Sequence, residues 1–263
     1  MIVPAPAVLD RLADRGWPAL DGEELGGWTL RASDGVTNRA NSVLTCGAVD
    51  DVEAAVATAE RWYADRCLPA VFQVSPASPP GLAGALRRRG YREHSATDIL
   101  VADRTAVAAA DPSPCVVDIA DAPSSGWLDT WWEVDGRGGD AERAIVSRIL
   151  AGGPALYAWS GDPAAPDAVA RLALAGEWGG LYAVATLPRA RRRGLARALA
   201  RALAVAAAAQ GVDRLWLQVL AGNDAAHGLY DDLGFVRASG YSYWEQVRLI
   251  RPCYTHDAGQ CGD

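Results

Sequence analysis

The chain has 263 residues, half of them hydrophobic and 22% charged, which is the composition of a globular protein large enough for one big domain or two smaller ones. The formal net charge of −7 argues against general nucleic-acid binding. No apolar run is long enough to span a membrane, and Asp10, Asp14 and Arg15 interrupt any signal-peptide core.

The five cysteines indicate the redox environment. Their number is odd, and no CxxC spacing or histidine pair accompanies them. We therefore expect reduced thiols and no metal site, and we predict that the protein is cytoplasmic.

The first part of the chain alternates helical and extended patterns. Residues 1–22 favour an amphipathic helix, and Trp28–Ala32 alternates like a strand. Turn residues at Ser33–Gly35 predict that Val36–Leu44 returns as the hairpin partner of that strand. The pattern then predicts a helix over 52–66, a strand over 70–75, a short helix over 81–89 and a strand over 95–102.

Residues 103–113 have the composition of a linker, and a second series of elements follows them. The expected elements are a strand over 115–119, helices over 124–134 and 141–150, strands over 156–160, 169–175 and 181–186, a helix over 194–209, a strand over 214–220 and a further helix before Gly234.

The most informative segment joins the strand at Leu181–Thr186 to the alanine-rich helix after it. Between them lies the turn Arg191–Ala196, which contains three consecutive arginines and a glycine. The start of a helix presents unpaired N–H groups and the positive end of the helix dipole. Gly194 lets a phosphate approach the backbone, so the turn predicts a pyrophosphate site; a solvated, arginine-rich helix start is the alternative.

Two motifs in this region resemble those of the GCN5-related N-acetyltransferase (GNAT) superfamily. The phosphate-loop pattern Arg/Gln-x-x-Gly-x-Gly/Ala is matched by Arg191, Gly194 and Ala196. The later pattern Asn-x-x-Ala-x-x-Leu-Tyr-x-x-x-Gly-Phe is matched by Asn223, Ala226, Leu229, Tyr230, Gly234 and Phe235. The resemblance covers roughly residues 115–250 and implies an α/β (α+β) GNAT fold, with a mixed, mostly antiparallel central sheet flanked by helices.

An internal similarity suggests that the fold is duplicated. Phe72–Val74, a helix and Gly90–Arg92 mirror Leu217–Val219, a helix and Gly234–Val236. We predict a GNAT-like domain over 1–105 and a catalytic GNAT domain over 106–263. The first is degenerate, because it has no arginine run and carries Leu86 where the second has a tyrosine.

The resemblance implies transfer of an acyl group from acetyl-CoA, or another acyl-CoA, to an amine. The pantetheine would pair with strand backbone, the pyrophosphate would lie on the loop amides, and Arg189 or Arg192 could reach the adenosine 3′-phosphate. Asn223 would bind the pantetheine or cap the following helix. The predicted cofactor-binding residues are Val184, Ala185, Thr186, Arg191, Arg192, Arg193, Gly194, Leu195, Ala196, Arg197 and Asn223.

Tyr230 is the predicted general acid, since a phenol of pKa about 10 suits a leaving thiolate of pKa about 8.5. Relatives often have a glutamate as base near Tyr182; here the nearest candidate is Glu177, acting through a water. An aromatic pocket that lowers the amine pKa by desolvation is the alternative. Without either, deprotonating an alkyl amine at neutral pH costs about 4 to 5 kcal/mol.

The acceptor is expected against aromatic side chains, with Tyr241 or Tyr243 as further candidates. These rings favour a partly apolar amine or a cation held on ring faces. The predicted acceptor-binding residues are Trp131, Trp132, Tyr182 and Trp216. We also expect the acceptor to be a small-molecule amine, the protein to have no membrane partner, and the oligomeric state to be a monomer or homodimer. Three alternatives stay open: a longer acyl-CoA, another donor (a carrier-protein thioester or an aminoacyl-tRNA), or a non-catalytic CoA sensor.

Overall fold

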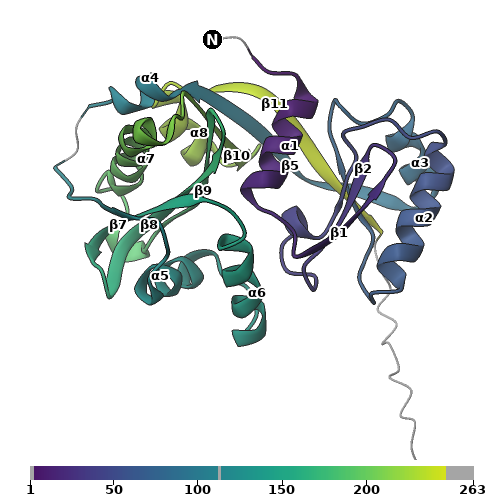
Figure 1. Ribbon diagram of the computed structural model, residues 1–263, viewed down its shortest axis with the longest axis horizontal. Coiled ribbons are helices and arrows are strands. Elements are labelled where there is room, and N and C mark those ends of the chain that lie inside the picture. The colour runs from purple at the N-terminus through teal and green to yellow at the C-terminus, as the bar shows by residue number, and fades with distance from the viewer. Residues whose placement is uncertain (1–2, 112–113, 247–263) are drawn as a thin grey trace, which may run out of the picture.

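The computed structural model describes residues 3–111 and 114–246, and its strands form a single eleven-stranded sheet (Figure 1). The order across the sheet is β1-β2-β3-β4-β11-β5-β10-β9-β8-β7-β6. The pairs β3/β4 and β9/β10 are parallel, and the other neighbours are antiparallel, which confirms the predicted fold class. The strands are β1 (Asp21–Leu25), β2 (Trp28–Ala32), β3 (Val43–Leu44), β4 (Val71–Val74), β5 (Tyr91–Asp103), β6 (Asp118–Ala120), β7 (Ala155–Asp162), β8 (Ala165–Ala175), β9 (Trp178–Thr186), β10 (Arg214–Leu220) and β11 (Val236–Gln246).

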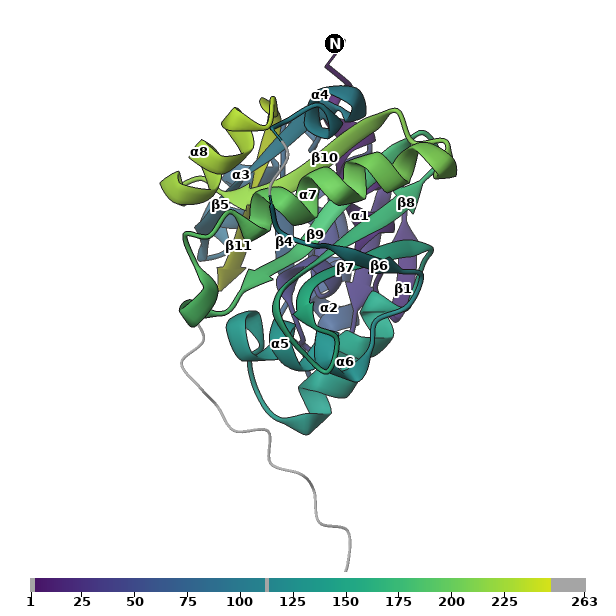
Figure 2. The same cartoon turned by 90° about the vertical axis from the view of Figure 1, so that its left-hand side faces the viewer.

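Helices cover both faces of the sheet. The α-helices are α1 (Pro6–Gly16), α2 (Val52–Ala64), α3 (Leu82–Arg88), α4 (Arg104–Ala108), α5 (Ser125–Asp135), α6 (Asp140–Leu150), α7 (Leu195–Ala206) and α8 (Asp224–Asp232). Short 3₁₀ turns are η1 (Asn38–Ala40), η2 (Pro188–Ala190) and η3 (Ala207–Gln210). Figure 2 shows α7 lying across β9 and β10, with α5 and α6 below them.

Strand alternation divides the buried side chains into three cores. Residues of α1, α5 and α6 pack on one face of the central strands. On the opposite face, α4, α7 and α8 cover β10 and its neighbours in the second half, whereas α2 and α3 cover β2 to β4 in the first half. We call the first of these the central core; it includes α1 from the start of the chain and β8 and β9 from the second half.

The element order occurs twice in the chain. The series β3-α2-β4-α3-β5 is followed later by β9-α7-β10-α8-β11, and each contains one parallel strand pair. The last strands of the two series are exchanged. β5 pairs with β10 of the second series, β11 pairs with β4 of the first, and β5 and β11 pair with each other. The exchange of β5 and β11 joins the two series into one sheet. The predicted domain boundary between residues 105 and 106 stays a prediction.

Two predictions were wrong in part, although β3 does pair antiparallel with β2 as expected. The hairpin partner of β2 is the preceding β1, joined through Gly26 and Gly27, and β2 meets the later segment only where Thr29 pairs with Leu44. Asn41 explains the difference: its Oδ1 accepts from the backbone N–H groups of Ser33 and Gly35, which holds this segment as a loop.

The predicted linker over 103–113 was also wrong in part, because α4 begins at Arg104. This arginine donates to the backbone oxygens of Val212 and Ala204, and buried Val107 packs in the core under α7.

Among the residues that the structure describes, no helix combines the length and apolar character needed to cross a bilayer. Cys46 and Cys67 have free thiols, whereas Cys253 and Cys261 lie outside the described residues.

Candidate active site

The parallel strands β9 and β10 separate where the site begins. Their pairing runs from Trp178/Arg214 to Leu181/Leu217. Directly after this, the register of β9 against β8 shifts, and Ala183 adopts a φ of +50°. This bulge bends β9 away from β10. Ala185 and Thr186 stay paired to β8, and the backbone from 184 to 186 has no pairing to β10, so this side of it is available to an extended ligand.

The predicted phosphate loop follows at once. After η2, both Arg192 (φ +64°) and Gly194 (φ +77°) are left-handed, and this turns the chain into α7. The first hydrogen bond of the helix is from Ala198 N–H to the Gly194 oxygen. The three preceding amides of the helix have no intrahelical acceptor, and its N-cap glycine has no side chain to cap them. This helix end is free for an anion.

Several arginines surround that helix end, and most of them contact other groups of the protein. Arg189 and Arg193 both bind the carboxylate of Asp167, at 3.1 and 3.3 Å. Arg197 lies 2.6 Å from Asp232, and Arg191 donates to the Thr186 oxygen. Arg192 is exposed, and none of the interactions found among the described residues involves its side chain. These surface ion pairs are weak enough to exchange for phosphate contacts.

The first half lacks such an anion site at the equivalent place. The N-terminus of α2 is capped by Asp51, whose carboxylate accepts from the amides of Glu53 and Ala54. The end of the β3/β4 pair is bridged by a side chain, because the Thr45 hydroxyl donates to the Gln73 oxygen at 2.7 Å. A carboxylate and a side-chain hydrogen bond thus occupy the positions that the second half leaves open.

Tyr230 lies in α8, on the face of the sheet that α7 covers. Its ring contacts Phe235 edge-on at 5.6 Å, and it belongs to the same core against which Val184 packs. Burial raises its pKa to about 12, so the phenol is protonated at neutral pH. No hydrogen bond found in the described part of the chain uses its hydroxyl. Asn223 caps α8, with its Oδ1 accepting from Ala226 N–H at 3.2 Å.

The predicted aromatic residues gather on the other face of β9 and β10. The Trp216 indole N–H donates to the Tyr182 hydroxyl at 3.2 Å, and that hydroxyl donates to the Ala13 oxygen at 3.0 Å. Trp131 of α5 lies in the same central core, and Trp132 packs against it with the two rings 6.0 Å apart. The gap between the strands therefore has Tyr230 on one side and these rings on the other.

Glu177 lies far from this gap. It is exposed in the turn between β8 and β9, where its backbone oxygen accepts from Asp213 and Arg214. Glu177 and Ala183 are six positions apart along the chain, which is about 20 Å of strand at 3.3 Å per residue. That length is too great for a base acting through one water.

Sequence analysis missed two arginines near the rings, of which Arg39 is partly buried and Arg171 is fully buried. Arg39, in η1, places its guanidinium 5.9 Å from the centre of the Trp17 ring. Burial opposes its charge, but nearby Tyr241, Tyr243 and Tyr182 outweigh this, so its pKa is raised. Arg171 lies opposite Tyr182 on β8 and is fully buried. Nothing in the local sequence marks either one, since Arg39 is in a polar loop and Arg171 is a single arginine in an apolar strand.

A surface cavity of about 320 Å³ lies beside these rings. Tyr241 belongs both to its wall and to the central core. The cavity also touches Ser75 after β4 and Ala221 after β10, so it opens between the ends of the two parallel pairs.

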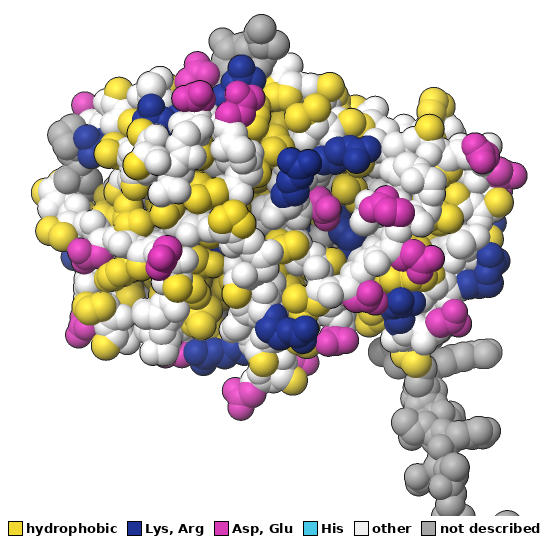
Figure 3. Space-filling model, in the orientation of Figure 1, with side chains coloured by type: hydrophobic (Ala, Val, Ile, Leu, Met, Phe, Trp, Pro, Cys, Tyr) yellow, Lys and Arg dark blue, Asp and Glu magenta, His cyan; other side chains and the backbone are white. Residues whose placement is uncertain are grey.

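The described residues contain no group of three or more His, Cys, Asp or Glu placed to hold a metal. On the face in Figure 3, basic and acidic side chains are interspersed.

A bulged, separated parallel pair that leads into an uncapped helix is the arrangement that the resemblance to the GNAT superfamily implies. Solved structures have the same fold: a GCN5-related N-acetyltransferase from Kribbella flavida has a TM-score of 0.68 at 20% identity, covering 93% of this chain and 97% of that one. A tandem GNAT protein from the clavulanic acid biosynthesis pathway has a TM-score of 0.64 at 15% identity, covering 93% and 88%.

The family follows from the sequence comparisons. A family model described as "Probable histone acetyltransferase Rv0428c C-terminal" matches residues 8–244, and the chain belongs to that family. It is 29% identical over 238 residues to the uncharacterized N-acetyltransferase YobR of Bacillus subtilis strain 168, covering 89% of this chain and 96% of that protein. The protein is thus an N-acetyltransferase, and its family implies an acyl-CoA cosubstrate.

Proposed function

We propose that the protein transfers acetyl from acetyl-CoA to a primary amine of a small molecule by direct attack. The observation that carries this is the contrast between the two halves: only the second combines an open parallel pair with an uncapped helix end among arginines. The proposed CoA site is the backbone of Val184, Ala185 and Thr186, the loop from Arg191 to Arg197, and Asn223.

In the proposed reaction the neutral amine nitrogen attacks the thioester carbonyl, the nitrogen loses one proton to solvent, and the carbon–sulfur bond breaks as the amide forms. Tyr230 donates a hydrogen bond to the leaving thiolate. The Tyr230 pKa of about 12 lies well above the ordinary thiol pKa of about 8.5. Complete proton transfer from the phenol to the thiolate is therefore uphill by about 5 kcal/mol. The contribution of Tyr230 is therefore stabilisation of charge developing on sulfur, with the final proton coming from solvent.

The amine becomes neutral by desolvation in this proposal, which leaves Glu177 out. Trp131, Trp132, Tyr182 and Trp216 form the apolar wall, and burial there disfavours an ammonium. Tyr182 cannot act as the base at neutral pH, because burial raises its pKa to about 12.

The CoA site is tested by calorimetric titration of a matched pair of variants. Ala196→Glu places a carboxylate at the free end of α7, and Ala54→Glu places one in the first turn of α2. CoA affinity should fall at least tenfold in the first variant and stay unchanged in the second. Equal affinity in both would rule out the proposed site.

Other donors, and a sensor without catalysis, are separated by a donor screen that detects free thiol. Acetyl-CoA should give the fastest release with an amine present. Faster release from a longer acyl-CoA, a carrier-protein thioester or an aminoacyl-tRNA would change the donor, and CoA binding without release from any donor would indicate a sensor. The tandem arrangement of 1–105 with 106–263, the cytoplasmic location and the monomeric or homodimeric state belong to the same proposal.

A further inference from the structure

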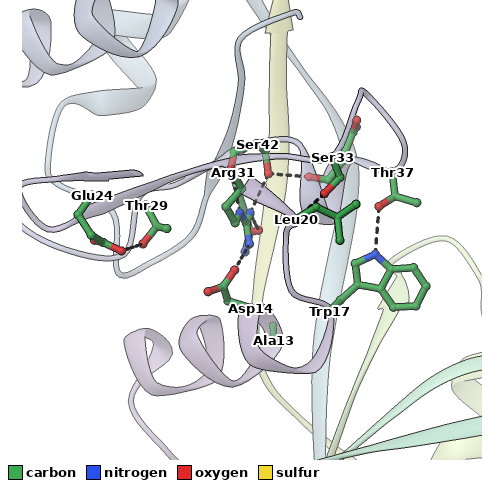
Figure 4. A network of polar contacts seen from close by, with 12 residues as sticks. Ala13, Asp14, Trp17, Leu20, Glu24, Thr29, Arg31, Ser33, Thr37 and Ser42 are labelled. Atoms are coloured by element: carbon green, nitrogen blue, oxygen red, sulfur yellow. Dashed lines mark hydrogen bonds and ion pairs between the residues drawn. The ribbon is translucent and has the colours of Figure 1, made fainter. Parts of the chain in front are cut away.

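Three arginines, Arg31, Arg39 and Arg171, have buried guanidinium nitrogens, and they fall into two kinds. Arg31 is paired: it lies 3.0 Å from Asp14 and donates to Ser42 (Figure 4). It also donates to the Gln73 side chain. Arg39 and Arg171 have no carboxylate among the described ion pairs and hydrogen bonds. Taking an unpaired charge out of water is costly, so the missing counter-charge needs an explanation.

Unused donors surround these two guanidiniums. The Nε of Arg39, the Nε1 of Trp131, the hydroxyl of Tyr243 and one terminal nitrogen of Arg171 are all buried without a partner at hydrogen-bond geometry, and the Tyr241 side chain is a close polar neighbour of both Arg39 and Tyr243. Trp131, Tyr243 and Arg171 are each at least nine-tenths buried. Buried polar atoms nearly always find partners, so four N–H or O–H groups left over together are unusual.

The four groups belong to residues in or beside one aromatic cluster of the central core. Trp17 lies 5.9 Å from Arg39, 6.3 Å from Trp131 and 5.8 Å from Tyr182. Its own indole N–H is already used, since it donates to Thr37 (Figure 4). Arg171 is the cross-strand neighbour of Tyr182.

Tyr243 completes the set from β11, with its ring 5.3 Å from that of Tyr241. Tyr182, which the cluster surrounds, immediately precedes the bulge at Ala183. A ligand bound by these donors would therefore lie beside the proposed point of acyl transfer.

We propose that the amine acceptor carries a carboxylate, as an amino acid does, and that Arg39, Tyr243 and Trp131 bind this carboxylate. The inference rests on the proposed function. A carboxylate supplies the oxygens that these donors lack and pairs with the planar guanidinium through two parallel hydrogen bonds. The rings around Trp17 suit an apolar or aromatic body between the carboxylate and the amine.

Two other acceptor classes fit this surface less well. A simple cationic amine held on the ring faces would be repelled by the two positively charged guanidinium groups, because it carries no negative group to balance their charge. A lysine side chain of a protein, the acceptor that the family description suggests for its namesake, has no carboxylate near its amine. Both would leave the donors unpartnered, and both serve as comparisons in the test.

The test uses acceptors that differ only in the carboxylate. Thiol release from acetyl-CoA is measured with L-phenylalanine against phenethylamine, with further matched pairs from an amine library, and with a lysine-containing peptide. The carboxylate member of at least one pair should have a kcat/KM about 30- to 100-fold higher. Preference for the amine lacking the carboxylate in every pair, or for the peptide, would overturn the inference.

Arg39→Met supplies the second measurement. It should lower kcat/KM for the carboxylate acceptor about 30- to 100-fold, mainly through KM, and leave the decarboxylated partner and CoA binding unchanged. Arg39→Lys should recover only part of the loss, because an ammonium cannot donate two parallel hydrogen bonds to a carboxylate as a planar guanidinium does. Arg15→Met, at an exposed arginine of α1, is the control and should change nothing. An equal loss for both acceptors in Arg39→Met would show a structural role and refute carboxylate binding.

Calorimetry separates failure of this inference from failure of the proposed function. CoA is titrated first, and absence of CoA binding refutes the proposed function. The CoA-loaded protein is then titrated with N-acetyl-L-phenylalanine and N-acetylphenethylamine, together with the acetylated library pairs. Tighter binding of carboxylate members, lost in Arg39→Met, supports the inference even without turnover; no such preference refutes it while the CoA site stands.

Discussion

The Asp167 carboxylate lies 3.1 Å from a guanidinium nitrogen of Arg189, and its second oxygen contacts Arg193 at 3.3 Å. One acidic side chain on β8 thus engages two arginines beside the proposed pyrophosphate site. Both arginines are more than half exposed, so each pair contributes little to stability.

Asp167→Asn should therefore strengthen CoA binding. Removing the carboxylate releases both guanidiniums and deletes a negative charge near the phosphates, so we expect CoA to bind about three- to tenfold more tightly at low ionic strength. The gain should shrink as salt is added. Asp21→Asn, which breaks the exposed pair with Arg66 in the first half, is the control. Weaker CoA binding in Asp167→Asn would mean that Asp167 orients the arginines toward the ligand.

Tyr230→Phe should abolish most of the catalytic activity and leave CoA binding unchanged. The hydroxyl makes no hydrogen bond to any described residue, so the melting temperature and CoA affinity should stay close to those of the unmodified protein. The kcat should fall about 100-fold or more. Because burial raises the tyrosine pKa to about 12, the residue should not titrate in the kcat profile below pH 10. A variant retaining full kcat would exclude the proposed role.

Features that depend on a short stretch of sequence were predicted from that stretch. The β9–α7 segment carries the apolar strand, the proline after it and the regular leucines of the helix, and all lie where expected. The uncapped helix end also follows from sequence, because Gly194 has no side chain to cap it. The similarity between Gly90–Arg92 and Gly234–Val236 correctly indicated two related strands, β5 and β11.

Relationships between distant segments could not be predicted in this way. The exchange of β5 and β11 is hidden because the apolar alternation of a strand says which face it buries, not which neighbour it pairs with. Arg39 looked like a loop residue, since its contacts are with rings from β9 and β11 far along the chain. Glu177 was chosen by counting along a strand whose bulge and separation from β10 lie at its other end.

Asp10→Asn should stabilise the protein at neutral pH. The side chain is buried in α1 and accepts from the Ser75 hydroxyl, and desolvation raises its pKa from 3.8 to about 6. A carboxyl whose folded pKa is raised favours the folded state below the unfolded pKa, and this contribution is lost as the pH rises to the folded pKa.

Above pH 6 the loss is complete and amounts to about 3 kcal/mol. Urea unfolding at pH 8 should show Asp10→Asn as more stable by up to that amount, with a smaller gain at pH 5. A gain that does not change between pH 5 and pH 8 would contradict the raised pKa.

Gly180→Ala should damage the aromatic wall. A Cβ at this position on β9 would lie 2.3 Å from the Trp216 ring and 2.7 Å from the Tyr182 ring, and Tyr182 is held by its hydrogen bond to Ala13. Because both rings are fixed, we expect a loss of about 1–3 kcal/mol in the free energy of unfolding. The KM for the acceptor should rise, and CoA affinity should hold. Gly228→Ala is the control: its Cβ would meet nothing within 4 Å on α8, and it should add about 0.5–1 kcal/mol of stability. If Gly180→Ala left both stability and acceptor KM unchanged, the rings would be free to move, and a preformed wall would have to be abandoned.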